Sequence, residues 1–157
     1  NPIDFERSDS ATCEFDYVFA MAQQYYNKGN IETSLEYLNK IPEELWTTQT
    51  LLVAARAYYK KKDYEMVIKL LDKKEVEKKY FVIFLLANSF LKTNSLQEAG
   101  EYFEMLRQYE DTIKINNVLG AIYHSLGERE KAKVCWDRAK KLEKKSVKKN
   151  QNSNKEE

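Results

Sequence analysis

Few side chains in this sequence are of the types that usually carry out catalysis or bind metals. His124 is the only histidine, and Cys13 and Cys135 are the only cysteines. One imidazole and two thiols cannot supply a structural zinc site with four cysteine and histidine ligands. We expect Cys13 to be a terminal thiol, Cys135 to pack between helices, and His124 to be a surface or packing imidazole.

The other candidates for chemistry are carboxylates and glycines. Glu43-Glu44 and Glu110-Asp111 are adjacent pairs in predicted loops, where solvation or helix capping is their expected role. The four glycines are too scattered for either glycine-rich nucleotide-binding motif. A catalytic constellation of nucleophile and base, paired carboxylates or metal ligands is therefore not expected. The sequence predicts a protein that is not an enzyme, with no catalytic residue, metal or other cofactor.

The composition predicts that the histidine, cysteines and carboxylates lie on a helical framework. The chain has 157 residues, of which 43% are hydrophobic and 32% charged, so it is expected to fold into one domain or a short stack of repeats. Only 4 glycines and 2 prolines leave little turn chemistry for a β-sandwich or barrel. An all-α fold is therefore expected.

The charge pattern excludes some classes of partner. The net charge of +1 gives no overall field that would attract nucleic acid or anionic lipid.

The sequence also bears on the location of the protein. The longest apolar stretch, Tyr80 to Leu91, is far shorter than the roughly 20 residues of a membrane span. Because the chain opens with Asn-Pro and shows no leader pattern, a processed protein or an excised fragment is expected. A cytoplasmic location is expected because neither cysteine has an obvious disulfide mate.

The sequence repeats itself four times at nearly constant spacing. The copies are anchored by Tyr25, Tyr58, Phe90 and Tyr123, which are 33, 32 and 33 residues apart. A small residue precedes each aromatic residue by three positions, which places both on one face of a first helix. A small residue there lets a second helix approach closely. The small residues are Ala22, Ala55, Ala87 and Gly120.

The second helix of each copy completes a predicted antiparallel pair. It offers a residue at the helix crossing and a bulky residue about one turn later. The crossing residues are Ser34, Val67, Ala99 and Ala132, and the bulky residues are Leu38, Leu71, Phe103 and Trp136. Gly29-Asn30, Lys62-Asp63, Asn94-Ser95 and Gly127-Glu128 are expected to form the turns. Ser95 and Glu98 additionally form a capping-box pattern.

These four copies resemble tetratricopeptide repeats, whose unit is a helix hairpin of about 34 residues. The resemblance implies an α-solenoid of about four hairpins wound into a right-handed superhelix. Some positions depart from the family pattern. Lys62 stands where glycine is usual, Lys74 where a small apolar residue is usual, and Asn116 where the other copies have Val18, Leu51 and Ile83.

The repeats set the expected domain boundaries. A tetratricopeptide domain is predicted over residues 13–143, with repeats at about 15–47, 48–79, 80–111 and 113–143. Residues 1–12 carry no periodic signal and are expected to be mobile. Residues 144–157 form a polar, lysine-rich tail that is expected to be disordered.

The resemblance also implies a function and a site. First helices of such solenoids line a concave groove, so we predict a scaffold or adaptor subunit that binds a peptide or helix of a protein partner. Packing between neighbouring first helices is the other role open to the groove aromatics. The resemblance places thirteen residues in the groove: Phe19, Gln23, Tyr26, Leu52, Arg56, Tyr59, Lys60, Phe84, Asn88, Leu91, Lys92, Asn117 and His124.

Two other kinds of partner stay open. RNA binding is the alternative function, because helical repeats can read single-stranded RNA and the lysine run at residues 140–149 could contact phosphates. A homo-oligomer through one end of the stack is also possible, because Phe15, Tyr17 and Val18 have no preceding helix to cover them.

Overall fold

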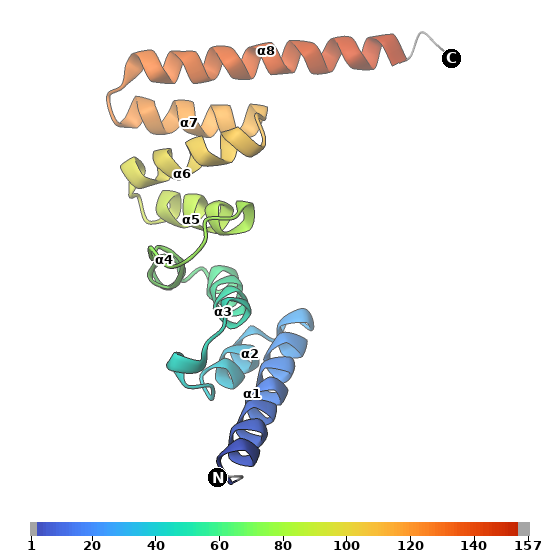
Figure 1. Cartoon of the computed structure of the whole chain (residues 1–157). Coiled ribbons are helices and arrows are strands. Elements are labelled where there is room, and N and C mark those ends of the chain that lie inside the picture. Colours follow the sequence, from blue (N-terminus) through green and yellow to red (C-terminus); the bar gives the residue numbers. More distant parts are fainter. Residues whose placement is uncertain (1–2, 154–157) are drawn as a thin grey trace. The chain divides into compact units, whose positions relative to one another are not determined.

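The computed structural model describes residues 3–153, with the side chains of residues 15–152. This part of the chain forms eight α-helices and one short 3₁₀ helix, and it contains no strand, so the all-α prediction is confirmed (Figure 1). The helices are α1 (Ile3–Asn27), α2 (Ile31–Leu38), η1 (Glu43–Leu45), α3 (Thr48–Lys60), α4 (Tyr64–Leu71), α5 (Tyr80–Lys92), α6 (Leu96–Tyr109), α7 (Ile113–Ser125) and α8 (Arg129–Ser153).

The chain divides into two compact units, Asn1–Val76 and Glu77–Glu157. Unit 1 contains α1 to α4 and unit 2 contains α5 to α8. The boundary falls in the connection between α4 and α5, close to Lys74, where the second repeat departs from the family pattern. The four hairpins are thus grouped in two pairs, where the sequence predicts one domain over residues 13–143.

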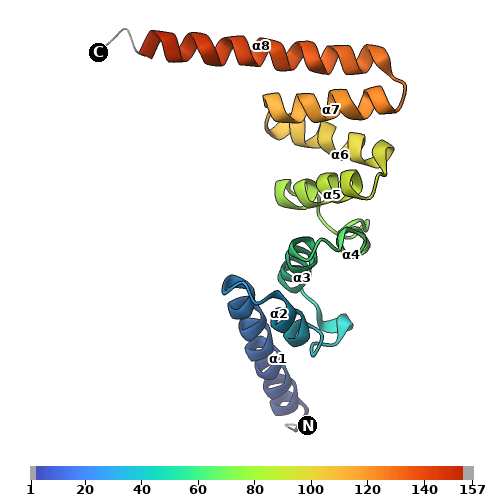
Figure 2. The same cartoon turned by 180° about the vertical axis from the view of Figure 1, so that it is seen from behind.

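Helices extend further at both ends than the sequence predicts. Helix α1 already begins at Ile3, and α8 continues to Ser153, well beyond the end of α7 (Figure 2). Residues 3–12 and 144–153 contain neither glycine nor proline, the two residues that disfavour a helix most. The four lysines and the glutamine of residues 144–153 also favour continuation of α8. Among the described residues, no helix is both long and apolar enough to cross a membrane.

Each hairpin is held by close packing at the predicted crossing. Ala22, Ala55 and Ala87 are completely buried, and Gly120 is buried as well. In the first hairpin the Ser34 hydroxyl donates a hydrogen bond of 2.7 Å to the carbonyl oxygen of Ala22. Helices α1, α2 and α3 contact one another in unit 1, and α6 contacts both α5 and α7 in unit 2. The predicted small residues are therefore buried in all four hairpins.

The turns inside the four hairpins share one backbone conformation. Gly29, Lys62, Asn94 and Gly127 have φ values of 82°, 63°, 60° and 80°. This left-handed region ends a helix and reverses the chain, and it suits glycine best because a Cβ atom crowds the following carbonyl. Lys62 thus adopts the glycine conformation despite its side chain.

Side chains cap several helices. The carboxylate of Asp63 accepts a hydrogen bond from the backbone N–H of Met66, and the amide oxygen of Asn30 accepts one from Thr33. The capping box predicted at Ser95 is wrong. Ser95 is the N-cap residue of α6, but its hydroxyl makes no capping hydrogen bond and instead shares one of 3.4 Å with Thr93.

We expect Gly120→Ala to lower the free energy of unfolding by about 1–3 kcal/mol, because the added methyl group overpacks the α7–α8 crossing. A Cβ atom on Gly120 would lie 2.7 Å from Cε2 of the Trp136 indole. Urea denaturation followed by circular dichroism measures the change.

Gly100→Ala is the matched control, because Gly100 is also a buried glycine inside a helix. Its added Cβ atom would meet Ile122 Cγ2 at an ordinary 3.5 Å. Alanine is favoured over glycine in helices by about 1 kcal/mol, so this variant should be as stable as the wild type or more so. Equal losses in both variants would contradict the assignment of Gly120 as the tight contact.

Candidate functional site

The predicted groove residues of unit 1 lie on the first helices α1 and α3 and reach the surface. Gln23 and Lys60 are exposed, and Phe19, Tyr26, Leu52, Arg56 and Tyr59 are half-buried. The Lys60 ammonium lies 4.3 Å from the centroid of the Tyr26 ring, a cation–π contact between α3 and α1. The structure thus brings Tyr26 and Lys60 together across the two helices. We call the surface formed by the predicted groove residues of α1 and α3 the α1–α3 face.

Tyr59 also takes part in packing. Its ring makes an edge-to-face contact with Tyr64 of α4, with centroids 5.5 Å apart. Burial and the nearby Tyr64 both raise the pKa of Tyr59. The phenol therefore stays neutral and can serve as a hydrogen-bond donor.

The predicted residues of unit 2 are exposed or half-buried, and their contacts stay within a hairpin. Phe84 is 38% exposed and lies against Phe81 of the same helix. The amide of Asn88 donates a hydrogen bond of 2.9 Å back to the carbonyl oxygen of Phe84. On α7 the exposed His124 ring lies 5.7 Å from the Trp136 ring of α8. Leu91 is half-buried, and Lys92 and Asn117 are exposed.

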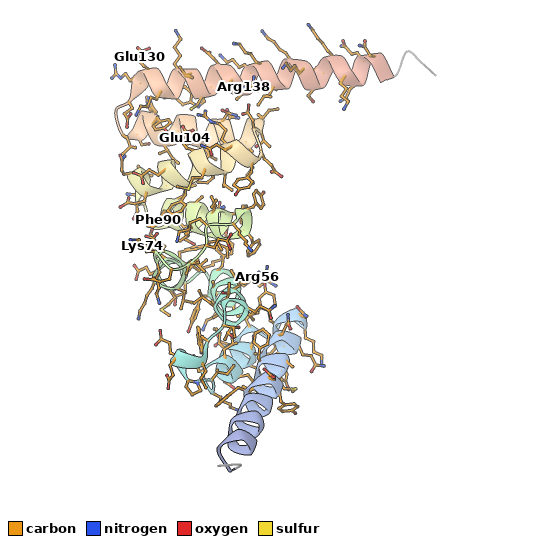
Figure 3. All side chains as sticks on the ribbon, viewed as in Figure 1. Arg56, Lys74, Phe90, Glu104, Glu130 and Arg138 are labelled. Atoms are coloured by element: carbon orange, nitrogen blue, oxygen red, sulfur yellow. The ribbon has the colours of Figure 1, made fainter. Side chains whose placement is uncertain are left out.

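A cleft that was not predicted opens between α6 and α8 in unit 2. Two cavities of about 430 and 220 Å³ share the lining residues Glu104, Arg107 and Val134. Helix α7 packs against both α6 and α8 and lies between them. Glu104 of α6 and Arg138 of α8, which both line the cleft, lie on either side of α7 (Figure 3). We call this the α6–α8 cleft.

A polar network underlies the α6–α8 cleft, centred on the buried Asn116. The amide nitrogen of Asn116 donates to Asp111 Oδ1 at 2.6 Å and to the carbonyl oxygen of Thr112 at 2.8 Å. Its amide oxygen accepts a hydrogen bond of 3.4 Å from Arg107. Arg107 in turn donates to Glu104 at 2.5 Å. A buried amide is costly unless it is hydrogen-bonded, and here both ends of the amide have partners.

Asp111 extends this network to α8. Arg138 donates to Asp111 Oδ2 from Nε at 2.7 Å and from Nη2 at 2.6 Å. The hydrogen bonds from Arg138 and Asn116 lower the pKa of the Asp111 carboxyl group. The carboxylate therefore links α7 to α8 in its charged form.

Two further ionisable groups that line the cleft, Tyr123 and Cys135, are held neutral. Tyr123 donates a hydrogen bond of 2.7 Å to Glu104, and burial together with this bond raises the pKa of Tyr123. Burial also raises the pKa of Cys135, although Arg107 donates to its sulfur at 3.6 Å. A thiol of this kind is a packing group and not a nucleophile. Cys13 lies outside the residues whose side chains are described.

Unit 1 contains a cleft of about 330 Å³ between the α2–α3 connection and α4, which we call the α2–α4 cleft. The Trp46 indole nitrogen donates a hydrogen bond of 3.0 Å to the carbonyl oxygen of Ile41, which fixes the indole at the wall. Tyr58 of α3 also lines this cleft. The other lining residues are Asn39, Pro42, Glu43, Met66, Lys69, Leu70 and Lys73.

The two clefts are built at equivalent positions. Nine of the ten residues that line the α2–α4 cleft have a counterpart 65 residues later that lines the α6–α8 cleft. Tyr58 corresponds to Tyr123, and Trp46 corresponds to Asp111. The same location is therefore lined by more charged side chains in unit 2 than in unit 1.

The sequence indicates that a polar residue is buried in the last repeat, but no pattern in it predicts the clefts. Asn116 was recognised as a departure from the apolar pattern, and a polar residue at a core position needs buried partners. Its partners Arg107 and Asp111 are ordinary charged residues whose proximity depends on the α6–α7 turn. Among the described residues, no cluster of three or more histidine, cysteine, aspartate or glutamate side chains could hold a metal ion.

Comparisons with known proteins match this arrangement to a repeat family and a fold. A family model described as tetratricopeptide repeat matches residues 113–146, which include α7 and most of α8. A comparison with curated protein sequences finds no match.

Several solved structures of MamA share the fold at low sequence identity. MamA AMB-1 has a TM-score of 0.73 and 18% identity, over 83% of this chain and 73% of that chain. MamA MSR-1 has a TM-score of 0.70 and 18% identity, over 84% of this chain and 78% of that chain. MamA from Desulfovibrio magneticus RS-1, from residue 41 to the end, has a TM-score of 0.66 and 14% identity, over 83% of this chain and 76% of that chain.

We expect Asn116→Leu to lower the free energy of unfolding by about 1–3 kcal/mol, although the other copies have apolar residues at this position. The substitution leaves Arg107 and Asp111 without their amide partner. A double-mutant cycle with Arg107→Leu tests this, with the stability of each variant measured by urea denaturation. The double variant should lose less stability than the sum of the losses of the two single variants. Additive losses would mean that the two residues do not act as one network.

We expect the stabilisation provided by Asp111 to depend on pH. Because its folded-state pKa is lowered, the contribution is complete above the unfolded value of about 4 and is lost as the pH falls through the folded pKa. Thermal unfolding of the wild type and Asp111→Asn, measured from neutral to acidic pH, should therefore converge at low pH. A stability difference that stays constant across this range would contradict the charge pairing with Arg138.

Proposed function

We propose that this chain, whose residues 113–146 are a tetratricopeptide repeat, is a non-enzymatic scaffold that binds other proteins. The family match confirms the resemblance seen in the sequence, and the structure has the helical-repeat fold of the MamA structures. Both are typical of interaction scaffolds, in which stacked hairpins present an extended surface. A subunit or adaptor of a larger assembly fits this role.

The observation that carries the proposal is the mixed chemistry of the α1–α3 face. Half-buried aromatic and aliphatic side chains, including Phe19, Tyr26 and Leu52, lie on the same helices as the exposed donors Gln23 and Lys60. Protein interfaces combine apolar anchors with a few polar groups in this way. Such a surface can bury the apolar stripe of a partner helix or peptide and hydrogen-bond its polar groups.

Helix α5 provides a comparable surface in unit 2. Phe84 is 38% exposed, Leu91 is half-buried, and Lys92 is exposed. The Asn88 side-chain amide has two N–H groups, and one of them donates to the carbonyl oxygen of Phe84 in the same helix. The other N–H group can donate to a partner. Lys92, Asn117 and His124 would extend this binding surface in the proposed mode.

Neither the family match nor the structural neighbours support RNA binding. The lysines of residues 140–149 are exposed on α8, which also suits a solvated helix end. A homo-oligomer through the end of the stack stays a prediction. Tyr17, one of the residues expected at that contact, is 66% exposed.

We expect Tyr59→Ala in unit 1 or Phe84→Ser in unit 2 to reduce retention of a partner by about tenfold or more, because each removes an apolar anchor. The measurement is a pull-down from the source lysate, quantified by mass spectrometry. Circular dichroism and a melting curve first establish that each variant is folded.

Met105→Ser on α6 is the matched control, because Met105 is 40% exposed and lies outside the predicted binding residues. It should retain the same proteins as the wild type. Equal retention by the wild type, Tyr59→Ala and Phe84→Ser would contradict binding at the first helices. Loss of the bound material on nuclease treatment would instead favour the RNA alternative.

A further inference from the structure

We infer that the second half of α8 is a separate binding site, which takes an acidic helix of a partner protein. This half of the helix, residues 140–149, contains six lysines and one glutamate. It includes none of the thirteen predicted groove residues. Binding here therefore does not depend on binding at the first helices.

The length of α8 leaves this half of the helix accessible. Helix α8 has 25 residues and α7 has 13, so α8 continues past the end of the helix that it packs against (Figure 1). The buried residues of α8 are Ala132, Cys135 and Ala139, which all precede residue 140. From residue 140 to residue 152 only Leu142 is half-buried, and the other residues are exposed.

The exposed lysines are arranged in two rows along one side of α8. Residues four apart lie on the same face of a helix. One row is Lys140, Lys144 and Lys148, and Lys141 and Lys145 lie beside it at the same interval. None of these five lysines forms an ion pair with a carboxylate of the described residues. The double row is therefore a face of positive charge that the chain does not neutralise itself.

Solvation accounts for the exposure of these lysines but not for their arrangement. The helix dipole favours cations only in the last turn of a helix, and the last turn of α8 contains no basic residue. Like charges four residues apart repel and destabilise a helix, as between Lys140 and Lys144 or between Lys141 and Lys145. Carboxylates of a partner that lie along the double row would relieve this repulsion.

The side chains of this half of α8 suit a protein partner better than a nucleic acid. Proteins that bind single-stranded nucleic acids stack the bases on aromatic side chains, and arginine is the residue best suited to bidentate phosphate contacts. Residues 139–157 contain neither an aromatic residue nor an arginine. Lysine is a flexible point charge, which suits exposed pairing with single carboxylates.

The position of the apolar side chains disfavours a membrane surface. A helix that lies in a membrane interface buries an apolar face between its cations. Here Leu142 and Val147 lie on opposite sides of the double row, each about a quarter to a third of a turn from its centre. A helix with glutamates at the same four-residue interval matches both the charge and the spacing, as charged flanking positions do in paired helices.

The probe is a capped, fluorescein-labelled peptide, Ala-Glu-Glu-Ala-Ala-Glu-Glu-Ala-Ala-Glu-Glu-Ala-Ala, added to the full chain at low ionic strength. We expect saturable binding by fluorescence anisotropy. A control peptide of the same composition has alternating alanine and glutamate, which places the carboxylates on opposite sides of a helix. It should bind at least about threefold more weakly, because only half of its carboxylates can face the lysines.

A pair of double variants locates the binding on α8. Lys144→Gln combined with Lys148→Gln should weaken the probe at least about threefold, and glutamine keeps the helix propensity of lysine. Lys69→Gln combined with Lys74→Gln is the matched control, because it removes the same charge from two exposed lysines of unit 1. It should leave the affinity unchanged. Circular dichroism establishes that both variants keep the helical content of the wild type.

The inference is overturned if the probe does not bind at millimolar concentration, if both peptides bind equally, or if both double variants have the same effect. A short single-stranded RNA and vesicles containing phosphatidylserine are the competing probes. Tighter binding of either one, lost in the α8 variant, would also overturn it. Because Tyr59→Ala and Phe84→Ser leave α8 unchanged, they should not alter the affinity for the peptide. Failure of the pull-down experiment and failure of this one are therefore distinguishable.

Discussion

The close approach of the two helices in each hairpin is the contact on which the rest of both units depends. It is possible because Ala22, Ala55, Ala87 and Gly120 place at most a methyl group between the two helices. A separated pair would expose the apolar residues that follow the crossing, such as the fully buried Leu38 and Leu71. Once the pair is closed, its outer surfaces are set: the first helices present Phe19, Tyr26 and Phe84, and the clefts open beside the second helices.

Unit 2 combines this packing with a buried polar network. Asn116 occupies a position that is apolar in the other copies, and full burial of its amide requires hydrogen-bond partners. Arg107 and Asp111 supply them, and Asp111 then binds Arg138 of α8. The polar residue Asn116 of α7 is thus accompanied by charged residues on α6, on the connection between α6 and α7, and on α8. Such a network favours a single arrangement of α6, α7 and α8, because any shift would leave a buried polar group without a partner.

The repeat architecture could be predicted because it follows from short-range periodicity. The small residues, the anchoring aromatic residues and the turns are each local patterns, and the structure places them where the 3.6-residue helix period requires. The helical ends were missed because the lysine-rich end of α8 has helix propensity without an apolar stripe. The clefts were missed because they depend on the space left between Tyr58 or Tyr123 and residues of two other segments. The groove residues are on the first helices as the resemblance implies, and their role in binding stays a prediction.

The structure repeats more faithfully every 65 residues than every 33. The first and third copies stack their anchors on a tyrosine of the second helix, Tyr25 on Tyr37 and Phe90 on Tyr102, at centroid distances of 5.4 and 5.5 Å. In the second and fourth copies the residues equivalent to these tyrosines are Leu70 and Cys135, so Tyr58 and Tyr123 lack that stacking partner and line a cleft instead. The two copies whose anchor tyrosine lines a cleft are thus the two in which a smaller residue replaces the aromatic residue of the second helix. The two cleft linings then differ at equivalent positions, because unit 1 has Trp46 where unit 2 has Asp111.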